Sequence, residues 1–176
     1  HFAGKSSDEE LKAECHARMA LLSLLEHRPC AIPRHLRAAH RAAATAKSRE
    51  FSLHASLVAA EFCLYRSEAV KALDQFEAAR KQADDACLLY YQLWAAFGVA
   101  KALAETAQYN PALRLAMRTA AIADRAGYRW WRFHSLVLAV RLALHLDKPS
   151  HSQLFTEATA LRENIEAGIG DDKIKR

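Results

Sequence analysis

Residues 88–127 read LLYYQLWAAFGVAKALAETAQYNPALRLAMRTAAIADRAG. The first half of this stretch, 88–106, is apolar at helical spacing and contains no proline. Asn110-Pro111 then forms a typical helix start, with Asn as the N-cap residue and Pro at the first helical position. Gly127 is typical of the residue that follows the end of a helix. The stretch therefore predicts two consecutive helices joined by a short turn.

Similar start and stop signals continue on both sides of this helix pair. Near the N-terminus, Ser7 and Glu10 have the spacing of a capping box and predict a helix that ends near His27. Its apolar residues recur every three or four positions, at Leu11, Cys15, Met19, Leu22 and Leu25. Further helices are predicted at 33–48, 49–66, 67–86 (with Ser67 as the N-cap), 128–146 and from Ser150 or Ser152 to Gly168. No segment alternates between apolar and polar residues as a strand does, so the predicted fold is all-α with about four helical hairpins.

Composition supports one ordinary helical domain. The chain has 176 residues, of which 52% are hydrophobic, 26% are charged, and only nine are glycine or proline. These values exclude the disordered, collagen-like and low-complexity classes. Alanine, the strongest helix former, makes up about a fifth of the sequence. We expect residues 7–168 to form the helical-repeat domain, residues 1–6 to be disordered or tag-derived, and residues 169–176 to be a flexible charged tail.

The helices recur along the chain, and the sequence predicts a period of about 42 residues. Ala69 and Ala112 open corresponding helices, which gives a step of 43 in residue number. Ala126-Gly127 and Ala167-Gly168 end corresponding helices, which gives a step of 41. Two helices of this length cannot bury an apolar face alone, but stacked neighbours can. The repeat therefore predicts a right-handed α-solenoid.

The motif Trp94-x-x-Phe97-Gly98, followed by Asn110-Pro111-Ala112-Leu113, resembles a tetratricopeptide repeat. The long period is similar to the repeats of large bacterial transcriptional regulators of the maltose-regulon activator type. The resemblance implies that two helices touch closely at Gly98, and that Ala55 and Ala139 take the place of this glycine in the neighbouring repeats. The chain departs from the family pattern at Lys101, where an aromatic residue is usual.

The resemblance also implies a concave groove formed by the first helix of each pair. With Trp94 as the register, the predicted groove residues are Gln92, Ala95, Val99, Leu103, Phe133, Leu136, Val140 and Leu144. Such a groove suits an amphipathic partner helix or an extended segment. The aromatic cluster Tyr128, Trp130, Trp131 and Phe133 packs into the neighbouring repeat in one interpretation, and contributes one or two rings to the groove in another.

Basic residues gather between 27 and 49, where no acidic residue occurs. Arg34, Arg37 and Arg41 share one helix face and form what we call the basic stripe. It is open to three interpretations: a solvated outer face, a contact for an acidic protein, or a phosphate contact with nucleic acid. Specific nucleic-acid recognition is not expected, because the stripe has no interleaved aromatic residue and no helix-turn-helix signature.

The sequence contains no recognisable catalytic or metal-binding constellation. The closest histidines, His35 and His40, are five residues apart, which does not suit a helical metal site. The four cysteines match no zinc or redox spacing and are expected to be reduced core residues. Glu61 stands in an apolar helix, either as a buried acid with a raised pKa or as an inner-surface carboxylate paired with Arg or Lys. We therefore expect a protein that is not an enzyme and needs no cofactor or metal.

The expected function is a non-enzymatic protein–protein interaction or regulatory module. The resemblance implies that it belongs to a larger signalling or transcription-regulatory protein. The alternative is a small-molecule effector-binding domain, which would show a closed pocket in place of an open groove. The longest apolar stretch, 88–100, is too short to cross a bilayer, so no membrane partner is expected. The cysteine pattern favours a cytoplasmic location.

Overall fold

The computed structural model describes the backbone of residues 2–174 and the side chains of residues 7–168. This part of the chain contains eight α-helices, one short 3-10 helix and no β-strand. The elements are α1 (Phe2–Leu25), η1 (Pro29–Ala31), α2 (Ile32–Ala46), α3 (Arg49–Tyr65), α4 (Ala69–Asp85), α5 (Leu89–Glu105), α6 (Tyr109–Arg125), α7 (Arg129–His145) and α8 (His151–Ile174). The predicted all-α fold of consecutive helical hairpins is confirmed.

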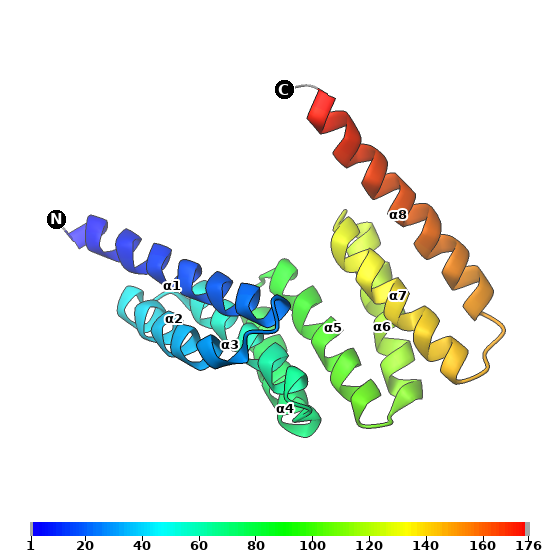
Figure 1. The fold of residues 1–176 in the computed structure, drawn as a ribbon, viewed down its shortest axis with the longest axis horizontal. Helices are drawn as coiled ribbons and strands as arrows, with labels where there is room; N and C mark the ends of the chain where they lie inside the picture. The colour runs from blue at the N-terminus through cyan, green and yellow to red at the C-terminus, as the bar shows by residue number, and fades with distance from the viewer. Residues whose placement is uncertain (1, 175–176) are drawn as a thin grey trace. The chain divides into compact units, whose positions relative to one another are not determined.

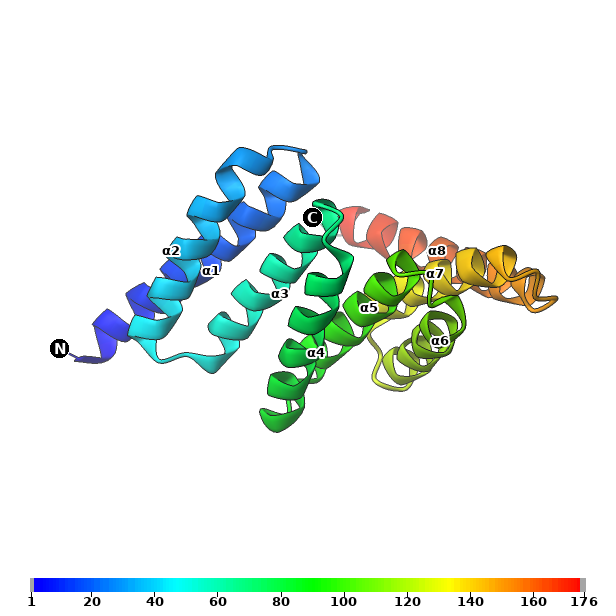
Figure 2. The same ribbon diagram turned by 90° about the horizontal axis from the view of Figure 1, so that it is seen from below.

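The chain divides into two compact units, His1–Gly98 and Val99–Arg176, and the boundary falls inside α5. In the first unit α2 packs along α1, α3 contacts both of them, and α4 packs on α3 (Figure 1). In the second unit α7 contacts both α6 and α8 (Figure 2). The predicted right-handed winding stays a prediction.

The turns between helices share one backbone feature at regular intervals. Each contains one residue in the left-handed backbone region, and its φ lies between +51° and +75°. These residues are His27, Lys47, Ser67, Cys87, Ala107, Gly127 and Asp147. Only Gly127 is the glycine that such a position favours, so six turns carry backbone strain in a side-chain-bearing residue.

Each of these turns has the hydrogen bonds of a Schellman motif. In the turn after α5, the amide of Gln108 donates to the carbonyl of Leu103 at 2.8 Å, and the amide of Ala107 donates to Ala104 at 3.0 Å. From Lys47 to Gly127, the next α-helix begins two residues after the left-handed residue of each turn. The predicted caps at Ser67 and Asn110 are therefore wrong, because Glu68 and Gln108 occupy the N-cap positions of α4 and α6.

The observed repeat is slightly shorter than the predicted one. Helices α3, α5 and α7 begin at 49, 89 and 129, and α4 and α6 begin at 69 and 109, so the step in residue number is 40. The estimate of 41 relied on Gly168, which lies inside α8 and does not end a helix. With the observed step, Val58 and Leu138 occupy the positions equivalent to Gly98. The assignment of Ala55 and Ala139 to these positions is therefore wrong.

The two ends of the chain differ from the predicted helix limits. Helix α1 begins at Phe2, so Ser7 lies inside the helix and is not its N-cap. Helix α8 continues past Gly168 to Ile174. The predicted flexible segments, 1–6 and 169–176, include residues 1, 175 and 176, which lie outside the described residues, and no side chain of either segment is described.

Alanines allow the helices of the first unit to approach closely. Ala13 of α1 packs with Ala42 and Ala43 of α2, and Ala17 packs with Ala39 and Ala55. All of these alanines are less than a tenth exposed. Alanine has little side chain to order, so it builds this interface at a low entropic cost.

Gly98 lies at a close helix crossing, but the second helix is α4 and not the helix that follows α5. A Cβ atom at Gly98 would overlap three ring carbons of Phe76, which is fully buried in α4. The glycine therefore accommodates the ring of the preceding helix. The tetratricopeptide resemblance implied close contact within a repeat, whereas this contact joins α5 to the helix before it.

Replacing alanine by glycine should have opposite effects on stability in a strained turn and in the middle of a helix. Ala107→Gly should raise the free energy of unfolding by about 0.5–1 kcal/mol, because glycine adopts positive φ without strain. Ala78→Gly, on the exposed side of α4, should lower it by about 1 kcal/mol through lost helix propensity. Urea unfolding followed by circular dichroism measures both. A loss of stability in Ala107→Gly would contradict the turn assignment.

Candidate functional site

The structure places the eight predicted groove residues in different environments. Ala95, Val99, Leu136 and Val140 are buried, so their side chains are not accessible to a partner. Gln92, Leu103 and Phe133 are partly buried, and Leu144 is exposed. The four groove residues of α7 were derived with a step of 41, which is one residue too long for the observed repeat.

The observed repeat brings a different set of residues into equivalent positions on α3, α5 and α7. We call this set the odd-helix face, and each unit carries its own part of it. The face combines two positions that are one helical turn apart. The residues are Glu50, Tyr90 and Trp130 at the first position, and His54, Trp94 and His134 at the second. Tyr90 and Trp130 are 43% and 61% exposed, although both are large aromatic residues.

In the first unit the odd-helix face links α3 to α5 through ring and hydrogen-bond contacts. The rings of His54 and Trp94 meet edge to face, with centroids 5.5 Å apart. The Tyr91 hydroxyl donates to Oε1 of Glu50 at 3.3 Å, and the Trp94 indole donates to Oε1 of Glu61 at 3.2 Å. Trp94 is thus one hydrogen-bond partner of Glu61, and the predicted pairing of this carboxylate with Arg or Lys stays a prediction.

The surroundings of this cluster favour neutral forms of His54 and Tyr91. Burial lowers the pKa of His54, and so does nearby Arg18, while Glu14 and Glu50 act in the opposite direction. Burial, followed by the Glu50 carboxylate, raises the pKa of Tyr91 well above its usual range. Both side chains are therefore neutral hydrogen-bonding groups near pH 7.

The second unit carries its own part of the odd-helix face, on α7. The ring of Trp130 lies 4.2 Å from that of His134 between centroids, and Phe133 contacts His134 at 5.4 Å. Burial and Lys101 lower the pKa of His134. Within the aromatic cluster of α7, Trp131 is buried and Trp130 is exposed, and the two interpretations of this cluster stay predictions.

Because of two histidines of the odd-helix face, we expect the free energy of unfolding to fall in acid. The pKa values of His54 and His134 are lowered in the folded chain from a usual value of about 6.5. Below this pH the unfolded chain binds more protons than the folded chain, which favours unfolding. The urea midpoint should therefore fall between about pH 7 and pH 5. The double variant His54→Gln/His134→Gln should show a smaller fall, and an equal fall would contradict the role of these histidines.

The basic stripe lies on the outer side of α2. Arg34, Arg37 and Arg41 are all exposed, as their spacing predicts. The buried side of the same helix carries Leu36 and Ala39. A partner for the stripe stays a prediction.

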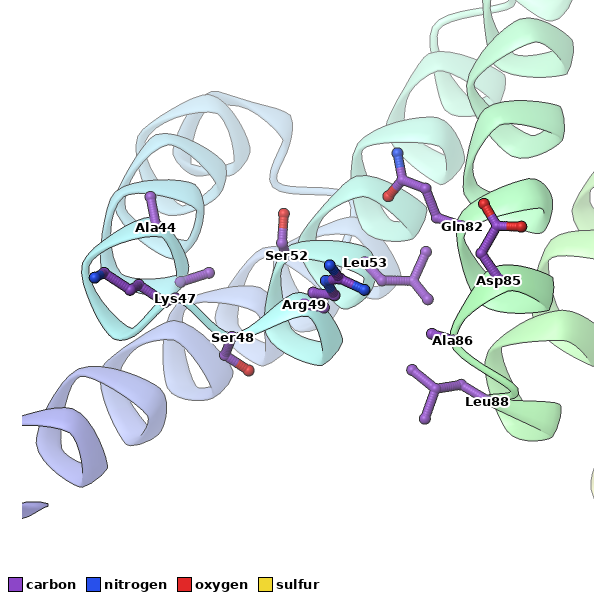
Figure 3. A pocket seen from close by; sticks show the side chains of 11 residues that line it. Ala44, Lys47, Ser48, Arg49, Ser52, Leu53, Gln82, Asp85, Ala86 and Leu88 are labelled. Carbon is purple, nitrogen blue, oxygen red and sulfur yellow. The ribbon is translucent and has the colours of Figure 1, made fainter.

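A pocket of about 490 Å³ lies where the α2–α3 turn approaches the C-terminal end of α4 (Figure 3). Its apolar part includes Leu53 and Leu88, and its polar part includes Arg49, Gln82 and Asp85. Figure 3 shows Arg49 and Leu53 on α3 opposite Gln82 and Asp85 on α4. The sequence does not predict this pocket, because its two walls are far apart along the chain.

His16 and His35 form a close pair that could not be recognised from their spacing in the sequence. Nδ1 of His16 and Nδ1 of His35 are 3.2 Å apart, and the pair joins α1 to α2. Among the described residues, no group of three or more His, Cys, Asp or Glu side chains is placed to hold a metal ion.

All four cysteines are free, but only Cys63 is buried. The prediction of core cysteines is therefore wrong for Cys15, Cys30 and Cys87.

No protein-family model and no curated protein matches this sequence. The tetratricopeptide resemblance therefore rests on the motif around Trp94 and Gly98. Among the described helices, none is both long enough and apolar enough to cross a bilayer.

Proposed function

We propose that this chain is a non-enzymatic protein-interaction module that binds peptide segments of its partner on the odd-helix face. The exposed rings of Tyr90 and Trp130, at equivalent positions of α5 and α7, are the observation that supports the proposal. Exposed aromatic rings of this size commonly supply the dominant contacts of protein interfaces. An amphipathic helix or an extended apolar segment has the chemistry to cover them.

The polar groups of the same face add specificity to this proposal. In the first unit His54 contacts the ring of Tyr91, which hydrogen-bonds Glu50, and His54 is neutral near pH 7. A partner that carries apolar anchors and a hydrogen-bonding or basic group fits this combination. By its resemblance to the repeats of bacterial regulators, the module belongs to a larger signalling or transcription-regulatory protein, and the location is cytoplasmic.

Selection from a random peptide library tests the proposed function. We expect enriched peptides to bind the parent chain with micromolar affinity. Tyr90→Ala or Trp130→Ala, according to the unit that a peptide contacts, should weaken binding at least tenfold, since a dominant aromatic anchor is worth about 2 kcal/mol or more. Met117→Ala is the matched control, because Met117 is an exposed apolar residue on α6, outside the odd-helix face.

Two outcomes of the selection would contradict the proposal. One is the absence of any enriched peptide, and the other is an equal affinity for the parent chain and both ring variants. The small-molecule alternative is supported by the pocket around Arg49, whose volume is within the range of ligand sites. Binders that respond to Arg49→Ala and to neither Tyr90→Ala nor Trp130→Ala would assign the function to that pocket.

A further inference from the structure

The pocket around Arg49 has charged groups on two sides and an apolar surface between them. Lys47 and Arg49 line the side formed by the α2–α3 turn and α3, and Asp85 lines the side formed by α4 (Figure 3). The apolar surface includes Leu53, which is 2% exposed, and Leu88, which is partly buried. The pocket thus places two positive charges opposite one negative charge.

These three charges are not neutralised by neighbouring side chains. Within the part of the chain that the structure describes, Lys47, Arg49 and Asp85 form no ion pair, either with each other or with another side chain. All three side chains are exposed. A ligand in the pocket can therefore approach each of them without breaking an existing ion pair.

Arg49 and Asp85 stand at helix ends that do not favour their charges. Arg49 is the first residue of α3, and Asp85 is the last residue of α4. The N-terminus of a helix carries a partial positive charge and the C-terminus a partial negative charge, so each side chain meets a like charge there. The stability of its own helix therefore explains neither residue. Residues that oppose the local preferences of a fold are typical of functional sites.

The repeat accounts for the apolar surface of the pocket but not for its charges. Leu53 corresponds, one step of 40 residues later, to Leu93, and both are buried. The three charged positions correspond to Cys87, Leu89 and Arg125. The packing of the repeat therefore requires a leucine at the base of the pocket, whereas it does not require the charges around it.

The backbone on both sides of the pocket is fixed by the turns between helices. The amide of Ser48 donates to the carbonyl of Ala43 at 3.1 Å, and the amide of Leu88 donates to the carbonyl of Ala83 at 3.0 Å. The Ser48 hydroxyl also accepts from the amide of Phe51 at 3.5 Å and caps α3. A pocket with a fixed rim is formed before a ligand binds, which lowers the cost of binding.

We propose that this pocket binds a small zwitterion of the amino-acid type, with a carboxylate, a free ammonium group and an apolar side chain. The carboxylate of the ligand pairs with the guanidinium of Arg49, whose planar fork of donors suits two carboxylate oxygens, and with the ammonium group of Lys47. The ammonium group of the ligand donates to the carboxylate of Asp85. The apolar side chain of the ligand lies on Leu53 and Leu88 and is removed from water there.

The volume of the pocket, about 490 Å³, limits the size of the ligand. This volume is within the range of small-molecule sites and accommodates a single amino acid or a dipeptide. Both carry the proposed chemistry, so the test includes both. The pocket shares no lining residue with the odd-helix face, and the proposal does not depend on the proposed function.

An NMR titration of the backbone amides of the full chain tests the proposal. The probes are L-leucine and L-leucyl-L-leucine, the N-acetyl derivative of each, which lacks the ammonium group, and the amide of each, which lacks the carboxylate. The signals of residues 43–53 and 82–88 should shift and saturate, with a dissociation constant below about 1 mM for at least one zwitterion. Its two derivatives should bind about threefold more weakly or worse, because each loses one ion pair.

Two substitutions test which side of the pocket holds which group. Arg49→Gln should weaken binding of the tighter zwitterion about threefold or more, but should not weaken binding of its amide, which has no carboxylate to lose. Asp85→Asn should weaken binding of the same zwitterion to a similar degree, but should not weaken binding of its N-acetyl derivative. Both variants should fold as the parent does, because neither charge stabilises its helix end.

Arg118→Gln and Asp74→Asn are the matched controls, because they remove the same charges from exposed positions outside the pocket. Both controls should bind the zwitterion with the affinity of the parent. The absence of a saturable shift at the pocket with either zwitterion would overturn the proposal, and so would equal affinities for a zwitterion and both of its derivatives. Shifts confined to the odd-helix face would also overturn it, while leaving the proposed function intact.

Discussion

Phe76→Ala is expected to lower the free energy of unfolding by about 3–5 kcal/mol. Phe76 is among the largest side chains of the chain that are completely buried. Its ring fills the space opened by Gly98, where a Cβ atom would overlap it. Loss of the ring removes its apolar contacts and leaves a cavity that rigid helix backbones on both sides fill poorly. Urea unfolding, followed by circular dichroism, measures the change.

Phe155→Ala is the control for this substitution. Phe155 lies on α8, and most of its surface is exposed. The same loss of atoms at that position should change the free energy of unfolding by less than about 0.5 kcal/mol. Equal losses in the free energy of unfolding for Phe76→Ala and Phe155→Ala would contradict the burial of Phe76 at the helix crossing with Gly98.

Gly98→Leu is expected to destabilise the chain by about 1–3 kcal/mol, or more if the helices cannot separate. The cause is overpacking, because even the first atom of the new side chain coincides with the Phe76 ring. The gain in helix propensity on replacing glycine, about 1 kcal/mol, acts in the opposite direction and is too small to prevail. The unfolding midpoint in urea should therefore fall.

Gly168→Leu separates overpacking from helix propensity. Gly168 also lies inside a helix, but no atom is within 4 Å of the position of its missing Cβ. This variant gains helix propensity without a collision and should be as stable as the parent or more so. If Gly98→Leu behaved in the same way as Gly168→Leu, the close crossing of α4 and α5 would be wrong.

Helix limits were predictable to within a few residues in the middle of the chain, because polar turns interrupt strong helical periodicity there. The length of the repeat was not predictable, because the residues at the left-handed positions of the turns do not mark them clearly in the sequence. Six of the seven left-handed positions lack glycine, and residues such as Cys87 and Ala107 among them give no turn signal in a sequence. Gly127 gave the right helix end, but Gly168, which looks the same in sequence, is helical.

The error of one residue in the repeat does not by itself explain the difference at the candidate site. Successive residues of an α-helix are separated by about 100° around its axis. A step of 41 therefore rotates the predicted surface of α7 by about a quarter of a turn, but the step of 40 leads to Ser135 and Ala139, which are buried as well. Ala95 and Val99, from which the step was counted, are also buried, so the surface chosen on α5 was itself an interior surface.

Periodicity identified the apolar residues of α1 but could not show which side of the helix packs. A leucine or methionine stripe normally outweighs alanines as a core face, because it buries more apolar area. In α1 the opposite holds, since Ala13 and Ala17 fit against the alanines of α2 and α3 at close range. The spacing of apolar residues along one helix does not show which of its sides fits the shape of a neighbouring helix.

The observed register of the repeat assigns the core and the odd-helix face, and one double-mutant cycle tests it directly. The register pairs Phe76 with Gly98 and, one repeat later, Ala116 with Leu138, so the large and small residues exchange places. Phe76→Ala/Gly98→Leu recreates the second pair at the first site. We predict that the double variant is more stable than Phe76→Ala alone, with a favourable coupling of about 0.5–3 kcal/mol in urea unfolding. Additive losses from the two substitutions would contradict the register.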